Sequence, residues 1–156
     1  MIEINKPNKY LYEVTWFDNY DGDSVNIKYK ITFDCGFEET ITKRGTLKVR
    51  LYGVDTPEIR GGTTDSKAAA NMAKKFVHDW LKWRLAANQV LFLSKEYKKG
   101  KFGRALGDFI DSDSGESLTD KLIYKKLGVK YYGQSKDDIQ ADHEANIQYL
   151  KSTGAL

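Results

Sequence analysis

The sequence has little cysteine or histidine and no long apolar run. Its 156 residues include one cysteine, which excludes a disulfide within the chain, so nothing favours a disulfide-stabilised secreted domain. No window approaches about 18 apolar residues, so we expect no membrane-spanning helix and no membrane partner. The first residues, MIEINKP, contain no apolar core of signal-peptide length. We therefore expect a soluble, cytoplasmic protein.

The residues that are present suit one folded domain. An apolar content of 40% and an aromatic content of 13% supply enough side chains for a hydrophobic core. A length of 156 residues predicts a single domain over 1–156, with its core at about 10–132 and a C-terminal helix at about 137–151. The net charge of +3 is only a weak indication of an anionic partner such as a nucleic acid.

Strands are predicted in five places. Residues 10–17 are rich in aromatic and β-branched side chains, and 25–33 alternate between apolar and polar, as a strand with one buried face does. The alternation returns over 47–52, while 90–93 and 105–110 are short apolar runs. Turn signals at 19–23 and 34–36 separate the first three strands, and 95–101 is a polar loop.

Helices are predicted in three places. Asp65 or Ser66 is expected to cap a helix that begins after the flexible segment 61–64. Its apolar stripe comprises Ala69, Met72, Ala73, Phe76, Trp80 and Trp83. A second helix opens at Ser117 and runs to about 127, and a third covers about 137–151. A strand meander with a helix before the fourth strand predicts an α+β fold with a mainly β core. The expected architecture is a five-stranded Greek-key barrel of the OB type with about three helices.

Three short segments place charged side chains at predicted turns and strand ends. They are Asp21-Gly22-Asp23, the stretch from Arg50 to Asp55-Thr56-Pro57-Glu58, and Lys101-Phe102-Gly103-Arg104. Asp23 is in phase with the buried face of its strand, where a carboxylate is costly unless it is neutralised. A hard cation such as calcium or magnesium does this, because it takes carboxylate, carbonyl and water oxygens. Asp55, at another strand end, is a second candidate ligand.

Phosphodiester hydrolysis needs two further kinds of group. One must position or deprotonate a water molecule, and cations must meet the charge that develops on the phosphate. Glu58 is the candidate base, three residues beyond Asp55. Arg50 and Arg104 are candidate clamps, because a guanidinium group can bind phosphate through two hydrogen bonds.

Each segment also has a plainer interpretation. Asp-Gly-Asp is a common turn, 55–58 can be a capped loop, and either arginine can be a solvated surface charge. Their occurrence together and in this order favours the functional interpretation. His78 and His143 are far apart and no cysteine cluster accompanies them, so zinc is not expected. Cys35 lies in a predicted turn with no nearby base, so a thiol nucleophile is not expected either.

The combined pattern resembles the staphylococcal-nuclease-like family. That family's motifs are Asp-Gly-Asp-Thr, then an arginine and apolar residues leading to Asp-Thr-Pro-Glu, then Tyr-Gly-Arg. Here they read DGDS at 21–24, R to DTPE over 50–58, and FGR at 102–104. The order of motifs and intervening elements agrees from about residue 10 to residue 132.

The resemblance implies a metal site. Asp23 and Asp55 would be ligands of one calcium ion, with the Thr56 carbonyl as the third protein ligand. Asp21 would lie behind these groups without touching the ion.

The resemblance also implies the catalytic and substrate-binding residues. Glu58 would hold or deprotonate the attacking water, and Arg50 and Arg104 would bind the scissile phosphate. Lys101 and Tyr132 would lie near the nucleotide's phosphate and base, although core packing is the alternative for Tyr132.

The implied activity is that of a calcium-dependent endonuclease. Its substrate would be DNA, with RNA as a further candidate, and it would cleave the P–O5′ bond to leave 3′-phosphates. We expect it to act as a monomer. The alternative is a non-catalytic OB-fold module that binds nucleic acid. Such copies of the fold lack the catalytic Arg and Glu positions, whereas Arg50, Glu58 and Arg104 are present here.

Two departures from the family pattern affect these expectations. Phe102 stands where the family has tyrosine, so a hydroxyl that would bind phosphate is missing, which affects affinity more than chemistry. The segment 34–46 is longer than usual and contains Asp34, Glu38 and Glu39. We expect it to lengthen a hairpin. If it projects beside the barrel mouth, its acidic residues would disfavour duplex substrates.

Overall fold

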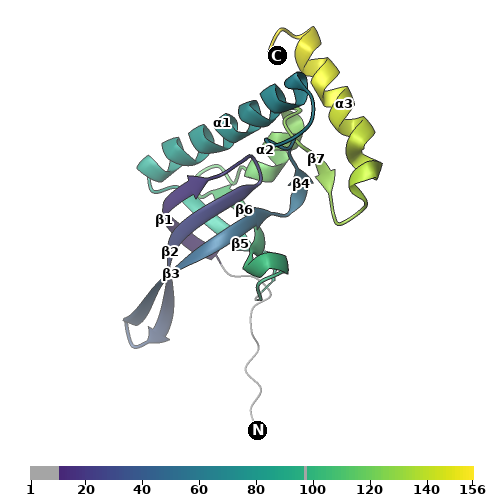
Figure 1. The fold of residues 1–156 in the computed structure, drawn as a ribbon. Coiled ribbons are helices and arrows are strands. Elements are labelled where there is room, and N and C mark those ends of the chain that lie inside the picture. The colour runs from purple at the N-terminus through teal and green to yellow at the C-terminus, as the bar shows by residue number, and fades with distance from the viewer. Residues whose placement is uncertain (1–10, 97) are drawn as a thin grey trace.

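The computed structural model describes residues 11–96 and 98–156, so Tyr10 of the first predicted strand and Tyr97 of the polar loop lie outside it. Five strands close into a barrel (Figure 1). In order around the ring they are β1 (Leu11–Asn19), β2 (Ser24–Gly36), β3 (Glu39–Leu51), β6 (Ala105–Asp111) and β5 (Val90–Ser94). The β3–β6 pair is parallel and the other pairs are antiparallel. The predicted α+β fold with an OB-type barrel is confirmed.

The barrel interior is filled by alternate residues of the strands. Val25 and Ile27 of β2 are buried, whereas Asn26 and Lys28 between and after them are exposed. The centre holds Phe92 and Phe109, both fully buried, with ring centroids 5.5 Å apart. Burial of one such side chain stabilises a fold by roughly 1.5–3 kcal/mol. The period-two pattern therefore predicted the inner face correctly at Val25 and Ile27. Phe33, its last apolar position, is 42% exposed, because β2 there extends past its pairing with β1.

Helix α1 (Thr64–Ala86) crosses the barrel and differs from its prediction in two details. Its cap is Thr63, whose hydroxyl accepts from the Ser66 amide, so the capping residue precedes the predicted ones. Trp83 is 69% exposed and does not belong to the buried stripe. The buried residues are Ala69, Ala70, Ala73, Val77, Trp80 and Leu81. A stripe drifts around a long helix because 3.6 residues per turn do not match a fixed step of three or four.

A second, two-stranded sheet was not predicted. Tyr52 breaks the third predicted strand, and β4 (Gly53–Asp55) pairs with β7 (Val129–Tyr131) instead of continuing in the barrel. The remaining short elements are the turn η1 (Lys101–Gly103), which precedes β6, and helix α2 (Leu118–Tyr124), which precedes β7. The N-cap of α2 is Ser117, as expected, but the helix ends earlier than predicted. Helix α3 (Lys136–Ser152) follows β7 and lies beside β4–β7 (Figure 1).

The segment 34–46 does lengthen the β2–β3 hairpin. Pairing continues to Gly36 opposite Glu39, with a register shift after Asp34 and the turn at 37–38. Figure 1 shows this hairpin extending from the barrel on the side opposite α3, β4 and β7. The acidic residues of the hairpin therefore do not flank the end of the barrel where Asp55 lies. They are not placed to repel a duplex bound at that end. Among the described residues, no helix is long and apolar enough to cross a membrane.

Candidate active site

The Asp21–Asp23 turn is held by its own first carboxylate. Asp21 Oδ1 accepts hydrogen bonds from the amides of Asp23 (3.0 Å) and Ser24 (2.8 Å), which fixes the start of β2. Gly22 is needed because a Cβ there would lie 2.8 Å from Thr56 Cγ2 and 2.9 Å from Ala73 Cβ. Any side chain would push the turn away from Thr56, so this glycine allows Asp23 to reach the end of β4.

Asp23 and Thr56 are joined directly although 33 positions separate them. Asp23 Oδ2 accepts from the Thr56 amide at 3.0 Å and from the Thr56 hydroxyl at 3.1 Å. Both residues are buried, with Asp23 8% and Thr56 2% exposed. These two bonds offset part of the cost of burying the carboxylate.

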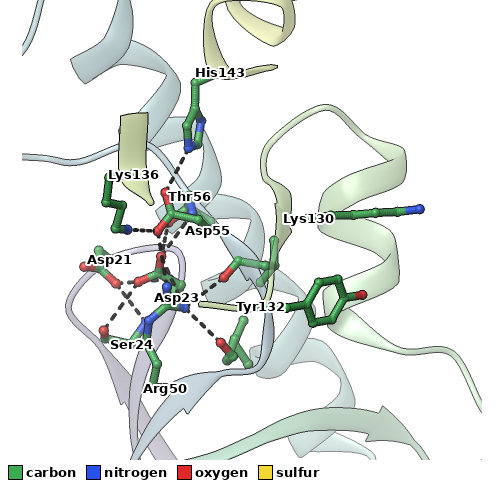
Figure 2. Close-up of polar contacts among 12 residues, drawn as sticks. Asp21, Asp23, Ser24, Arg50, Asp55, Thr56, Lys130, Tyr132, Lys136 and His143 are labelled. Carbon is green, nitrogen blue, oxygen red and sulfur yellow. Dashed lines mark hydrogen bonds and ion pairs between the residues drawn. The ribbon is translucent and has the colours of Figure 1, made fainter. Parts of the chain in front are cut away.

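Arg50 connects the two carboxylates. Its Nη1 donates to the Leu51 and Val54 carbonyls at 2.8 and 2.9 Å, which places the guanidinium over the kink between β3 and β4. Nη1 also lies 3.5 Å from Asp23 Oδ2, and Nη2 donates to Asp55 Oδ1 at 3.2 Å. We call Asp21, Asp23, Arg50, Asp55 and Thr56 the carboxylate cluster (Figure 2).

A lysine and a histidine from α3 complete this arrangement, and they were not predicted. Lys136 Nζ donates to Asp55 Oδ1, and His143 Nε2 lies 2.9 Å from Asp55 Oδ2. An ionised carboxylate only accepts, so Nε2 carries the proton. Burial would raise the pKa of Asp55, but the hydrogen bonds from His143 and Lys136 outweigh it and lower that pKa below its ordinary value. Lys136 and His143 are seven residues apart, so the sequence placed them on one face of the helix. It could not show that this face packs against Asp55.

Asp21 differs from Asp55 because its nearest charged neighbour is another carboxylate. Burial, followed by the negative charge of Asp23, raises the pKa of Asp21 to about 6. The hydrogen bonds from the Asp23 and Ser24 amides oppose this rise without cancelling it. The turn therefore carries negative charge that a bound cation would stabilise.

Glu58 is exposed and shares a cavity with the cluster. A cavity of about 310 Å³ lies between α3 and the segment 55–66. Asp55, Glu58 and His143 all contribute to its wall. Within residues 11–96 and 98–156 the Glu58 side chain makes no hydrogen bond or ion pair. The carboxylate is thus free to meet a water molecule or ligand in this cavity.

Arg104 reaches the same face of the sheet as Arg50 from a different strand. It follows η1 in an extended conformation (φ −90°, ψ 142°) and leads into β6, where Leu106 pairs with Arg50. Strand spacings of about 4.8 Å and 3.3 Å per residue place the two arginine Cα atoms roughly 8 Å apart. Arg104 Nε is buried and has no hydrogen-bond partner among the described residues. A buried donor without a partner is unusual and is the kind of group that an anionic ligand satisfies.

Comparison with known families agrees with this geometry. The sequence model of the family described as "Staphylococcal nuclease homologue" matches residues 48–153, which is more than half of the chain. The chain belongs to this family. The matched region contains Asp55, Glu58 and Arg104, but it begins after the Asp21–Asp23 turn, which the structure itself places against Thr56. A comparison with functionally described proteins gave no match.

The two predicted substrate-binding residues of this staphylococcal nuclease homologue lie outside the carboxylate cluster. Tyr132 is 62% exposed and packs edge-on against Tyr52, with ring centroids 5.6 Å apart. Figure 2 shows Tyr132 and Lys130 pointing away from the carboxylates. Lys101 is exposed in η1, three residues before Arg104. The structure thus brings Asp21, Asp23, Arg50, Asp55 and Thr56 together. Outside this cluster, Glu58, Lys101 and Tyr132 are exposed and Arg104 is partly buried.

The donors of the cluster fit a hard cation. Across the described residues, no three His, Cys, Asp or Glu side chains converge as a complete metal site. Two carboxylates with a backbone carbonyl would instead leave positions for water, as calcium sites with few protein ligands do. The protein's own cations already gather at the same oxygens, which indicates how strongly this point attracts positive charge. Lys136 and His143 would have to leave Asp55 when an ion binds.

Proposed function

We propose that this nuclease homologue is a calcium-dependent endonuclease that hydrolyses phosphodiester bonds of DNA, with RNA as a second candidate substrate. The observation that carries the proposal is the convergence of Asp23 and Asp55 on the Arg50 guanidinium, at the end of the barrel. Paired carboxylates suit a cation, and an adjacent guanidinium suits a phosphate, so one site offers partners for both.

Asp23, Asp55 and the Thr56 carbonyl would hold the calcium ion, which polarises a phosphoryl oxygen when bound. Glu58 faces the same cavity as Asp55 and would orient and deprotonate the attacking water. Arg50 and Arg104 would clamp the non-bridging oxygens, and the unpaired Nε of Arg104 supplies a donor that needs no rearrangement of protein bonds. By its family, the enzyme would cleave the P–O5′ bond and leave a 3′-phosphate.

Cleavage of end-labelled DNA and RNA, in calcium and in chelator, tests the proposal. We expect cleavage in calcium alone, with the ends of the products carrying 3′-phosphates. Asp23→Ala and Asp55→Ala should lose both calcium binding and cleavage. Full activity in chelator would remove the metal from the mechanism.

Glu58→Gln separates catalysis from binding. It keeps the shape of the side chain but removes the base, so turnover should fall steeply while calcium affinity is retained. Glu38→Gln is the matched control, because Glu38 is also an exposed glutamate but lies at the tip of the distant hairpin. Specific binding of nucleic acid without cleavage under any metal condition would instead support the non-catalytic binding module.

A further inference from the structure

A groove outside the carboxylate cluster combines lysines with exposed aromatic rings. It has a volume of about 410 Å³ and runs over the outer faces of β1, β2 and β3 beneath the segment 99–103. Its wall includes Trp16, Lys28, Lys48, Lys99 and Phe102, and none of the described residues that line it is acidic. We call these five residues the basic aromatic groove.

The register of the barrel connects this groove to the cluster. On the outer face, Arg50 pairs with Ser24, Lys48 with Asn26, and Thr46 with Lys28. Lys28 in turn pairs with Trp16 of β1. Ser24 and Lys28 are four residues apart on β2, or roughly 13 Å at about 3.3 Å per residue. A mononucleotide cannot span this distance, whereas an oligonucleotide can.

The aromatic side chains of the groove are held toward solvent. Trp16 is 44% exposed, and the Lys28 ammonium lies 5.3 Å from the centre of its ring. Phe102 is 86% exposed and has a φ of +60°, a left-handed conformation that is costly for a bulky residue. Trp16 is thus partly and Phe102 largely open to solvent, and rings in such positions stack well on unpaired bases.

We propose that the basic aromatic groove binds the single strand that flanks the scissile phosphate, with bases stacked on Trp16 and Phe102 and phosphates near Lys28 and Lys48. The lysines of the groove favour a polyanion, although Asp18 lies on the same outer face opposite Asn26, and the flat rings favour bases over an acidic peptide. In a duplex the bases face one another and cannot reach these rings, so the groove selects single strands. This proposal rests on the proposed function, because it extends the substrate path of the same site.

Binding in chelator tests the groove without cleavage. The probe is a fluorescent single strand of about 12 nucleotides, within the ~4–16 nucleotides that one OB fold covers. Trp16→Leu should weaken its binding about tenfold, and Trp16→Phe should restore most of the affinity because it keeps a ring. Binding of a blunt duplex should change little. Equal losses for single strand and duplex would overturn the proposed stacking.

Helix α1 carries a matched control pair. Trp83 is 69% exposed, and Lys82 Nζ lies 5.8 Å from its ring, which reproduces the Trp16–Lys28 pair away from the groove. Trp83→Leu should leave oligonucleotide affinity unchanged. If it weakens binding as much as Trp16→Leu does, the effect is not specific to the groove and the proposal fails.

Salt dependence tests the lysines. The double variant Lys28→Gln/Lys48→Gln should reduce the slope of log affinity against log salt by about 1.4, or about 0.7 for each phosphate that is no longer neutralised. Lys82→Gln should not change the slope. Competition by poly-glutamate as strong as that by oligonucleotide would show a general polyanion surface and would overturn the assignment.

The two proposals fail independently. If the protein never cleaves nucleic acid but Trp16→Leu weakens single-strand binding, the nuclease proposal fails and the groove stands. If the protein cleaves in calcium but Trp16→Leu binds like the parent, the groove fails and the nuclease stands.

Discussion

The carboxylate cluster and the turn before β6 are the two halves of the candidate site, and they are built differently. In the cluster, Asp23 and Asp55 are only 8% and 4% exposed, and the protein's own donors bind both carboxylates. In the turn, Phe102 is 86% exposed, and Arg104 Nε has no partner within the described residues. The carboxylates of the cluster therefore already have protein donors, whereas the turn contains a donor that only a ligand would pair. Substitutions in the cluster should affect both folding and function, and those in the turn function alone.

Arg50→Ala should have the largest effect. It removes the only side chain that bridges Asp23 and Asp55 among the described residues and leaves two buried carboxylates less well paired. Breaking a buried pair costs about 3–5 kcal/mol of stability, and loss of a phosphate clamp costs roughly 100- to 1000-fold in turnover. Urea unfolding beside single-turnover cleavage measures both. Unchanged stability would show that Arg50 is not a structural part of the cluster.

Arg104→Ala should lose roughly 100- to 1000-fold in turnover with almost no change in stability. Its Nε forms no bond that folding needs. Cleavage rates at saturating oligonucleotide, compared with melting temperature, measure the two effects. A variant that cleaves at the parent rate once saturated would make Arg104 a binding residue, and a large loss of stability would remove the contrast between the two halves.

Lys136→Met should tighten calcium binding by about tenfold. Its ammonium neutralises Asp55 in the structure, so an incoming ion must displace it, and removal of that competitor favours the ion. Calcium titration by calorimetry measures the change without any cleavage. Lys130→Met is the matched control, since Lys130 points away from the cluster in Figure 2. Equal calcium affinity in both variants and the parent would show that Lys136 does not compete with the ion.

Asp21→Asn should produce the smallest effect, a gain in stability of about 1 kcal/mol at neutral pH in chelator. The pKa of Asp21 is raised from 3.8 to about 6, so the folded protein binds this proton more tightly than the unfolded chain does. That contribution is complete below about pH 4 and is lost as pH rises through about 6. The whole pKa shift would correspond to a larger gain in stability than this. The Asp21 side chain is partly exposed, however, and solvent screens its interaction with Asp23.

Asparagine keeps the oxygen that accepts the Asp23 and Ser24 amides but carries no charge. The parent and variant should therefore be equally stable at low pH and diverge between about pH 4 and 6. Asp142→Asn, an exposed position on α3, controls for the substitution itself. A constant difference across the whole pH range would contradict the role of the raised pKa.

Local patterns predicted most of the fold and the burial of one carboxylate of the cluster. Alternation identified the inner faces of the strands because each inward side chain must be apolar to fill a closed barrel, as Val25 and Ile27 do. The phase of Asp23 within that pattern indicated a buried carboxylate, and Asp23 is buried and paired. Turn chemistry predicted the sharp connection at Gly22, which the approach of Thr56 requires. These features depend on residues that are close together in the chain, so they can be predicted from the sequence.

The remainder depends on contacts between distant segments. Whether Trp83 was buried depended on how α1 rests on the barrel, and the break at Tyr52 arose because β4 pairs with β7, which lies far along the chain. The β2–β3 hairpin extends away from α3, β4 and β7, which no local pattern indicated. The sequence by itself determined the barrel, its inner faces and the residues that carry charge. Only the tertiary structure decided that Lys136 and His143 meet Asp55 and that Trp16 lies on the same face as Arg50, because packing brings together groups that no local pattern relates.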